Sequence, residues 1–235
     1  MSTGARLRQV RLLQLASPAL PIGAYSYSSG LETAIDDGRV ADGETALQWI
    51  GDMLTLVIGR FDAPVAAAAH AAATGGDRGS LGALSRHVLA SRETAELRLE
   101  TEQMGYSLDK WIRAVLEAPD EPGGPTLPVG PILPEGPVAA PVAWGAAGAR
   151  LGLDAADTVT ALLWGFAENQ VMVLLKAMPM GQIQGQRVLD ALVPVIDRVT
   201  GEALARPAED WSTSAPGLAI ASMRHEVQYS RLFRS

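Results

Sequence analysis

The sequence contains no cysteine, and this absence excludes several kinds of chemistry at once. Disulfide frameworks, thiolate zinc sites, iron–sulfur ligation and thiol catalysis all require cysteine sulfur. Only three histidines occur in 235 residues, so a metal site built from several histidines is also hard to form. Basic residues number 19 against 26 acidic ones, and phosphate binding normally needs a basic excess. We therefore predict no metal site, no cofactor and no nucleic-acid partner.

Long uninterrupted apolar runs are also missing from the sequence. The most apolar stretch, residues 161–180, contains Glu168 and Lys176, so it lacks the roughly 18 consecutive apolar residues of a transmembrane helix. The first apolar segment after the N-terminal arginines is broken by Pro18 and Pro21, which is unlike a signal peptide. Shares of 48% hydrophobic and 19% charged residues are typical of a globular protein. We predict a cytoplasmic protein that does not contact a membrane.

Apolar residues recur every three or four positions over most of the chain, and no run alternates β-branched with polar residues. The clearest example lies between Ser91 and Val115, where one apolar seam follows a rod that is otherwise charged. This pattern predicts an all-α fold, a single-domain bundle of about ten helices over residues 1–235, without a sheet. The predicted helices are residues 6–16, 28–36, 46–58, 62–73, 79–90, 91–115, 141–151, 154–177, 184–199 and 216–228.

Residues 119–141 differ from the rest of the chain in composition. Eight prolines occur there, about three positions apart, together with several glycines. Such proline-rich runs adopt extended, polyproline-like conformations and do not form helices. We interpret this segment as a surface connection between two halves of one bundle.

Known catalytic motifs are incomplete in this chain. Gly181–Gln186 is not followed by the Lys-Ser/Thr pair of a phosphate-binding loop, and no Gly-x-Ser-x-Gly turn occurs. His225-Glu226 begins like a zinc-protease helix, but Tyr229 stands where the second histidine would be. We therefore predict that the protein is not an enzyme.

Two alternatives stay open. One is a helical enzyme with a ligand pocket among Trp49, Trp111, Trp144 and Trp164, which would be favoured by two or more titratable groups converging on a pocket. The other is a helical scaffold for an unrelated metalloenzyme. Tryptophans at helical spacing are more often part of a core, so both alternatives rank below a protein-contact function.

Residues 222–235 are unusual for a chain end, because they do not become a run of small polar residues. Arg224, Arg231 and Arg234 make this tail basic on an acidic protein, and Tyr229 and Phe233 supply apolar anchors. Arginine and aromatic residues together are typical of interface hot spots, and chain ends fray unless something holds them. The tail is predicted either to dock a partner or to fold back onto its own bundle, and in an oligomer it could do both.

A second unusual segment lies near the start of the chain, where Tyr25 and Tyr27 follow a proline-fixed turn. Two amphipathic aromatic residues beside an apolar loop are typical of a protein-contact surface. The alternative is that the serines cap a helix start and the tyrosines pack against it.

At these two segments the sequence resembles the UreF family of urease accessory proteins. The resemblance begins with Leu12–Gly23, Tyr25–Ser28 and Gly30–Glu32, and it continues with Ser91–Thr94, Glu96–Arg98, Glu168–Gln170, Gly181–Gln182, Gly185–Gln186, Ser214–Leu218 and Met223–Ser235. These motifs occur in the family's order over nearly the whole chain, and the tail is the most specific of them.

The resemblance implies an all-α homodimer with a non-catalytic role. It implies a complex with the accessory protein UreD/UreH and the nickel-carrying GTPase UreG, which loads nickel into apo-urease. By the same resemblance, the tail with Tyr229 and Arg231 docks UreD/UreH, and the dimer surface forms the platform for UreG. The predicted partner-binding residues are Arg224, His225, Glu226, Tyr229, Ser230, Arg231, Leu232 and Phe233, together with Tyr25, Tyr27 and Arg92.

The donor groups in the sequence are consistent with an adaptor role. Nickel prefers nitrogen and sulfur donors, which this chain scarcely has, so help with nickel must come through its partners. A more mechanistic version places an arginine beside the γ-phosphate of GTP, where it accelerates hydrolysis, and Arg92, Arg98 and Arg224 are the candidates. Holding the GTPase in one conformation requires no inserted arginine.

Overall fold

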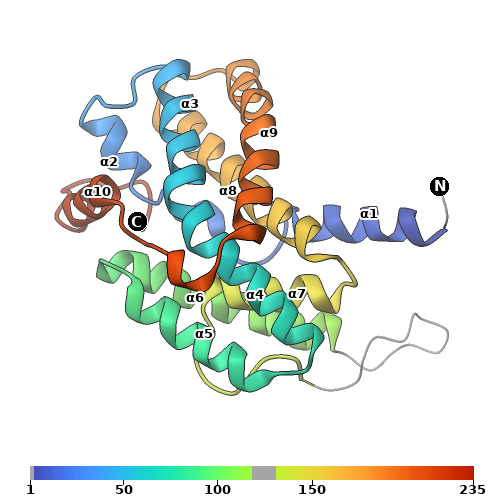
Figure 1. Ribbon diagram of the computed structural model, residues 1–235. Helices are drawn as coiled ribbons and strands as arrows, with labels where there is room; N and C mark the ends of the chain where they lie inside the picture. The colour runs from blue at the N-terminus through green and yellow to red at the C-terminus, as the bar shows by residue number, and fades with distance from the viewer. Residues whose placement is uncertain (1–2, 118–130) are drawn as a thin grey trace.

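The computed structural model describes residues 3–117 and 131–235 (Figure 1). Within these ranges all regular structure is helical and no strand occurs, which confirms the predicted all-α fold. The α-helices are α1 (Thr3–Leu15), α2 (Leu31–Asp36), α3 (Gly43–Asp52), α4 (Asp62–Thr74), α5 (Arg78–Ser91), α6 (Ala95–Trp111), α7 (Ala140–Arg150), α8 (Ala155–Ala177), α9 (Gln182–Ala205) and α10 (Pro216–Glu226).

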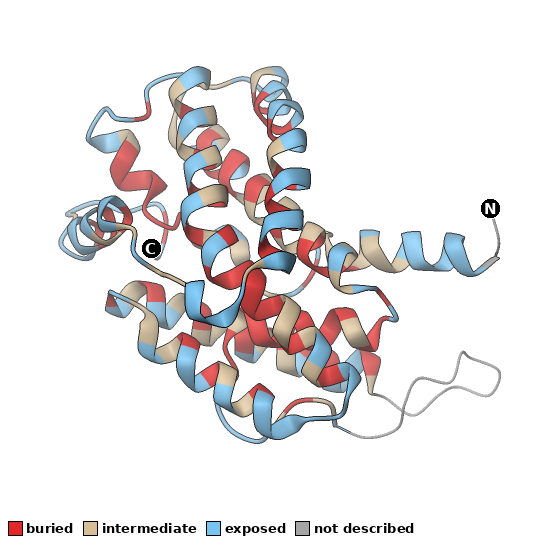
Figure 2. Ribbon diagram, viewed as in Figure 1, coloured by how far each residue is buried: buried red, intermediate tan, exposed pale blue. Residues whose placement is uncertain are grey.

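The helices form two adjoining groups. Helices α3, α8 and α9 run side by side in the upper half of Figure 1, and helices α4 to α7 lie below them. One cluster of buried apolar side chains fills the lower group and a second fills the upper group. Helix α4 contributes Ala63 to the upper cluster and Val65 to the lower one, so it joins the two groups. In Figure 2 the buried residues accordingly concentrate on α4, α7 and α8.

The contact between α4 and α7 depends on a glycine. A Cβ atom at Gly145 of α7 would lie 2.2 Å from the carbonyl oxygen of Ala66 in α4, which is closer than real Cβ contacts occur. Only glycine therefore allows these two helices to approach as they do. This close approach sets the spacing of α4 and α7 within the lower group.

Several predicted helices differ from the observed ones at their ends. Helix α1 begins at Thr3 instead of residue 6, and α9 runs to Ala205 where the prediction ends at residue 199. Three other helices differ as follows. The helix predicted from Ser91 begins at Ala95, because the Thr94 hydroxyl caps it by accepting from the Leu97 amide at 3.2 Å. The helix predicted from Ser28 begins at Leu31, because Ser29 and Gly30 have positive φ angles of 49° and 79°. The helix predicted over residues 46–58 begins at Gly43 and changes to π and 3₁₀ turns after Asp52.

The proline-rich segment is described only in part. Its residues 119–130 lie outside the described residues, so the predicted surface connection remains a prediction there. Residues 131–139 are not helical, and they place Leu133 and Val138 in the lower core. The Arg78 side chain donates to the Leu133 carbonyl from two nitrogens, at 3.0 and 2.7 Å. The described part of the segment is therefore packed against the lower group.

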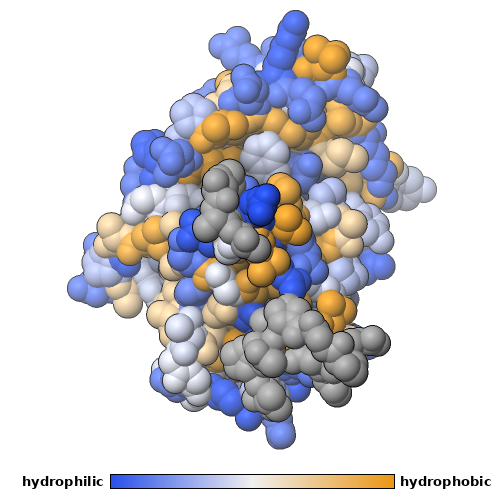
Figure 3. Space-filling model, turned by 90° about the vertical axis from the view of Figure 1, so that its right-hand side faces the viewer, coloured by the Kyte–Doolittle hydropathy of each residue, from blue (hydrophilic) through white to orange (hydrophobic). Residues whose placement is uncertain are grey.

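Helix α1 projects from the body at the right of Figure 1. Its side chains Leu7, Val10 and Leu13 are 51%, 61% and 69% exposed. Figure 3 shows hydrophobic patches on the face from which this helix emerges. An unpartnered apolar helix face of this kind is typical of an interaction surface.

Helix α8 is long and apolar enough to cross a membrane by length and composition, and half of the relevant window is buried inside the fold. A buried core helix passes the same test, so this is a weak indication. The absence of membrane contact, the cytoplasmic location and the single-domain organisation all remain predictions.

Candidate partner-binding site

The C-terminal tail, residues 222–235, folds back onto α2 and α6 of its own chain. Figure 1 places the chain end beside α2 and α10, away from the N-terminus. Two backbone hydrogen bonds hold it to the segment before α2: the Arg234 amide donates to the Ser26 carbonyl, and the Ser28 amide donates to the Ser235 carbonyl, both at 2.8 Å. Phe233 and Ser235 are buried as a result. Of the two predictions for the tail, folding back onto the bundle is what the structure shows.

The α10 helix reaches α2 at a glycine. A Cβ atom at Gly30 would lie 3.1 Å from Leu218 and 3.3 Å from Ala221, both in α10. Because Gly30 also has a positive φ, this position combines a tight turn with close packing. The start of α2 and the face of α10 are therefore fitted to each other.

Glu32 of α2 is the main acceptor for the tail. This carboxylate is almost fully buried, at 4% exposure. Its two oxygens accept from the amide of Leu232 at 2.7 Å and from the amide of Phe233 at 3.0 Å. The His225 ring lies against the same side chain, with Nε2 3.2 Å from a carboxylate oxygen. A buried carboxylate is stable only when donors surround it, and here the tail supplies them.

Glu96 of α6 is the second acceptor. One of its oxygens lies 2.7 Å from Nδ1 of the fully buried His225, and the other accepts from Arg231 at 2.7 Å. His225 thus bridges two carboxylates from helices distant in sequence. Charge-assisted hydrogen bonds of this kind are the strongest a side chain makes. They fix α10 between α2 and α6.

The last residues of the tail reach a third carboxyl group, Glu100 of α6. The Ser235 hydroxyl donates to one oxygen at 2.6 Å, and the Ser29 hydroxyl donates to the other at 3.1 Å. Burial raises the pKa of Glu100, against the opposing effects of these hydrogen bonds and of the Arg92 charge. Folding of the tail therefore covers a carboxyl group that water would otherwise solvate.

The outer face of the tail carries apolar side chains that are exposed to solvent. Tyr229 is fully exposed, Val227 is 82% exposed and Leu232 is 53% exposed. Among the described residues, the Tyr229 hydroxyl has no hydrogen-bond partner. The backbone beneath these side chains is anchored, so they stand on a fixed surface. Preorganised aromatic and aliphatic side chains of this kind are suited to protein binding.

The predicted partner-binding residues fall into two groups by exposure. Those that face solvent are Tyr25, Arg224, Glu226, Tyr229, Ser230, Arg231 and Leu232, and those that are buried or nearly so are Tyr27, Arg92, His225 and Phe233. Of the buried members, Tyr27, His225 and Phe233 support the tail and the segment before α2 from inside the fold. Tyr27, for example, hydrogen-bonds Gln103 of α6, and burial raises the pKa of its hydroxyl. Whether any of them binds a partner remains a prediction.

Arg92 lies apart from the tail surface. Its guanidinium forms an ion pair with Asp62 at the start of α4, and the two side chains are only 12% and 9% exposed. It also lies over the ring of Phe61, 5.8 Å from the centroid. Arg92 therefore joins α4 to the segment before α6.

Sequence reasoning missed Glu32, Glu96 and Glu100 as functional residues. A basic tail on an acidic chain needs acidic acceptors, and this charge contrast was the available signal. The particular carboxylates that accept hydrogen bonds from the tail could not be predicted, since Glu32 and Leu232 are 200 positions apart.

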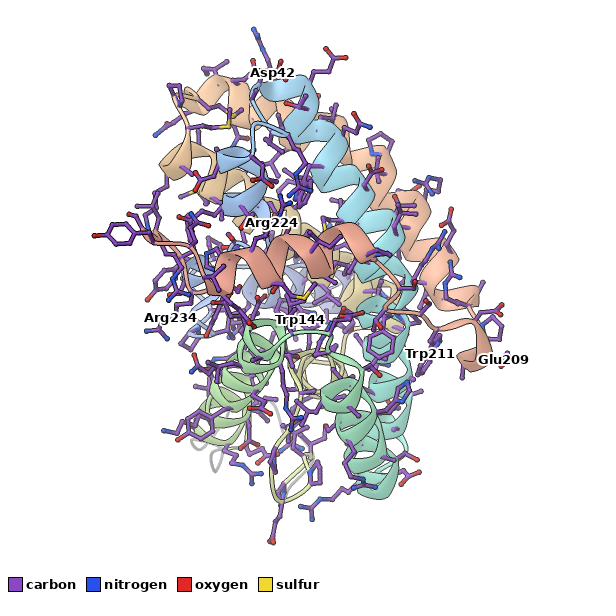
Figure 4. The ribbon with its side chains drawn as sticks, turned by 90° about the vertical axis from the view of Figure 1, so that its left-hand side faces the viewer. Asp42, Trp144, Glu209, Trp211, Arg224 and Arg234 are labelled. Carbon is purple, nitrogen blue, oxygen red and sulfur yellow. The ribbon has the colours of Figure 1, made fainter. Side chains whose placement is uncertain are left out.

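A cavity of about 400 Å³ lies between the two helix groups. Of the four tryptophans of the enzyme alternative, only Trp144 lines it, and Figure 4 shows this residue in the middle of the molecule behind α10. Titratable side chains do converge on the cavity, the feature that would favour an enzyme. However, Asp62 and Arg92 pair with each other, and Glu100 is bound by two serines. No two of these groups form a nucleophile and base pair in the part of the chain described.

The chain is similar in sequence to known proteins. The family model UreF matches residues 40–193. A curated protein of Azoarcus sp. (strain BH72) named "Urease accessory protein UreF" is 47% identical over 232 residues, covering 99% of this chain and 97% of that protein. Proteins of the same name from Azotobacter vinelandii (48% identical) and Dechloromonas aromatica (45% identical) cover 95% and 97% of this chain, and 97% and 98% of their own lengths. The chain therefore belongs to the UreF family, whose members matched here are named urease accessory proteins.

Proposed function

We propose that this chain is a non-catalytic adaptor in urease maturation. It acts as a homodimer in a complex with the accessory protein UreD/UreH and the GTPase UreG, and this complex assists GTP-dependent nickel insertion into apo-urease. The names of the relatives support a role alongside urease. The observation that carries the proposal is the tail, which presents Val227, Tyr229 and Leu232 to solvent from an anchored backbone.

The side chains of the described residues support a role without direct nickel binding. No group of three or more histidine, aspartate or glutamate residues within residues 3–117 and 131–235 is placed to hold a metal ion. His225 has both ring nitrogens against carboxylates, and Nε2 of His70 lies 2.9 Å from the Leu153 carbonyl. We therefore assign nickel handling to the partners and assembly to this chain.

The arginines support regulation of UreG by conformation. Arg92 pairs with Asp62, Arg98 pairs with Glu102 at 2.9 Å, and Arg224 pairs with Asp37 at 2.8 Å. An arginine inserted beside a nucleotide would first have to leave its carboxylate. Binding that favours one conformation of the GTPase requires no such step.

The proposal is tested by co-purification with UreD/UreH. Tyr229→Ala should weaken the complex while leaving helical content unchanged, because this side chain supports nothing in its own chain. Arg231→Ala should weaken it as well, by loosening the tail from Glu96. Tyr106→Ala is a matched control, since Tyr106 is an exposed tyrosine of α6, at 59% exposure. Full recovery of the complex with both tail variants would contradict the tail as the docking element.

A further inference from the structure

The cavity between the two helix groups is large for a protein interior. Interiors are close-packed and few of their voids exceed one water molecule, whereas pockets that bind small molecules measure about 300–1,000 Å³. The volume of about 400 Å³ falls in the second range. Its inner wall is apolar, with Phe61, Trp144 and Phe166 among its members. The exposed side chains of Tyr25 and Met172 mark where it meets solvent.

The charged groups around the cavity are mostly acidic. Asp62, Glu93, Glu100 and Glu168 contribute carboxyl groups, and Arg92 contributes the only basic group among the lining residues. The Arg92 charge is already matched by Asp62. The remaining electrostatic character of the cavity is therefore acidic, and it favours a ligand with a positive charge.

Glu168 of α8 is the lining group most in need of a partner. It is half-buried, and among the described residues no group hydrogen-bonds or ion-pairs with its carboxylate. Burial alone raises the pKa of its carboxyl group. A cation beside it would stabilise the ionised form and offset the cost of its partial burial.

We propose that this cavity binds an organic ammonium ion, whose apolar body packs against Trp144 and Phe166 and whose charge pairs with Glu168. The ligand is a small amphiphilic amine. A metal ion would need several ligating groups at one point, and the described side chains do not gather in that way. The site does not include the exposed face of the tail, although Tyr25 and Arg92, two of the predicted partner-binding residues, are among its lining residues.

The test compares three probes of the same chain length: octylammonium, octanol and octanoate. Isothermal titration with the full chain should show that octylammonium binds about tenfold more tightly than octanol, because a charge-assisted hydrogen bond is added to the same apolar contact. Octanoate should bind more weakly than octanol. Nuclear Overhauser effects between the octyl chain and the Trp144 indole should place the ligand in the cavity.

Two variants distinguish the contribution of the Glu168 charge to binding from that of the apolar cavity. Glu168→Gln should reduce octylammonium to the affinity of octanol and leave octanol unchanged, whereas the matched control Glu209→Gln, at an exposed carboxylate outside the cavity, should change neither. Gly165→Leu should weaken both probes, because Gly165 lines the cavity and a leucine there would occupy it. Equal binding of octanol and octylammonium, or the absence of contacts to Trp144 in the unaltered chain, would overturn the proposal.

Discussion

Removal of the Glu32 carboxylate is the sharpest test of how the tail is held. In Glu32→Ala, the amides of Leu232 and Phe233 lose their acceptor, and Phe233 is buried in the folded tail. A buried donor without a partner costs about 1–3 kcal/mol, so the two amides together cost about 2 kcal/mol or more. His225 also loses one of its two carboxylate contacts. The expected result is that the tail detaches while the helix bundle stays folded.

The magnitude can be measured by amide hydrogen exchange. A loss of about 2 kcal/mol corresponds to roughly a 30-fold shift in the docking equilibrium. Protection of the tail amides should therefore fall at least about 30-fold in Glu32→Ala, and that of α4 should not change. Glu32→Gln should lie between the two proteins, because its carbonyl oxygen serves one amide while its NH₂ group faces the other.

Two controls make the result specific. Glu209→Ala removes an exposed carboxylate that has no partner among the described residues, and it should leave tail protection unchanged. Tyr229→Ala removes the fully exposed ring and should also leave the tail docked. Unchanged tail exchange in Glu32→Ala would refute the role of this carboxylate. An equal loss of protection in α4 would show that Glu32 supports the whole bundle and has no specific role in the tail.

Three further predictions concern the interior. Burial raises the pKa of Glu100, so ionisation of this carboxyl group opposes folding. The free energy of unfolding is therefore unaffected by Glu100 below the pKa of this group in the unfolded chain, and it falls as pH rises from there toward the pKa in the folded chain. Urea unfolding of Glu100→Gln across this range should lack that fall, and an unchanged pH slope would contradict the assignment. Gly145→Ala should destabilise by about 1–3 kcal/mol because it forces α4 and α7 apart, whereas Gly165→Ala, with ordinary contacts, should stabilise by about 0.5–1 kcal/mol; thermal unfolding measures both. Arg92→Ala should cost about 3–5 kcal/mol by leaving Asp62 buried alone, and the double variant with Asp62→Ala should cost less than Arg92→Ala.

Helix periodicity predicted most of the fold, because it depends on neighbours three and four positions apart. The boundaries of α4, α5, α7 and α8 fell within one residue of the prediction. The errors at the starts of α2 and α6 occurred where one local interaction overrides periodicity. Thr94 caps the start of α6 within a stretch whose apolar spacing continues on both sides of it. The positive φ of Gly30 places the start of α2 later than the spacing predicts. Such interactions depend on backbone angles, which apolar spacing does not reveal.

The tail could be recognised from the sequence, but its binding partners within the chain could not. Composition marks arginine and aromatic residues as contact groups without saying what they contact. The acceptor Glu96 is 129 positions from His225 and 135 from Arg231, and only the folded chain brings them together. The cavity was beyond sequence reasoning for the same reason, since it is formed by residues from several helices.

The folded tail also changes which of its groups a partner can use. The sequence suggests a basic docking surface, but Arg224 pairs with Asp37, Arg231 pairs with Glu96, and Arg234 donates to Gln103. These arginines are engaged by the chain's own acidic and amide groups, so their charge holds the tail in place. The unengaged groups on the outer face are apolar, with Tyr229 the most exposed. We therefore expect a partner to recognise the docked tail by shape and apolar contact, while its basic side chains contribute to the intramolecular fold.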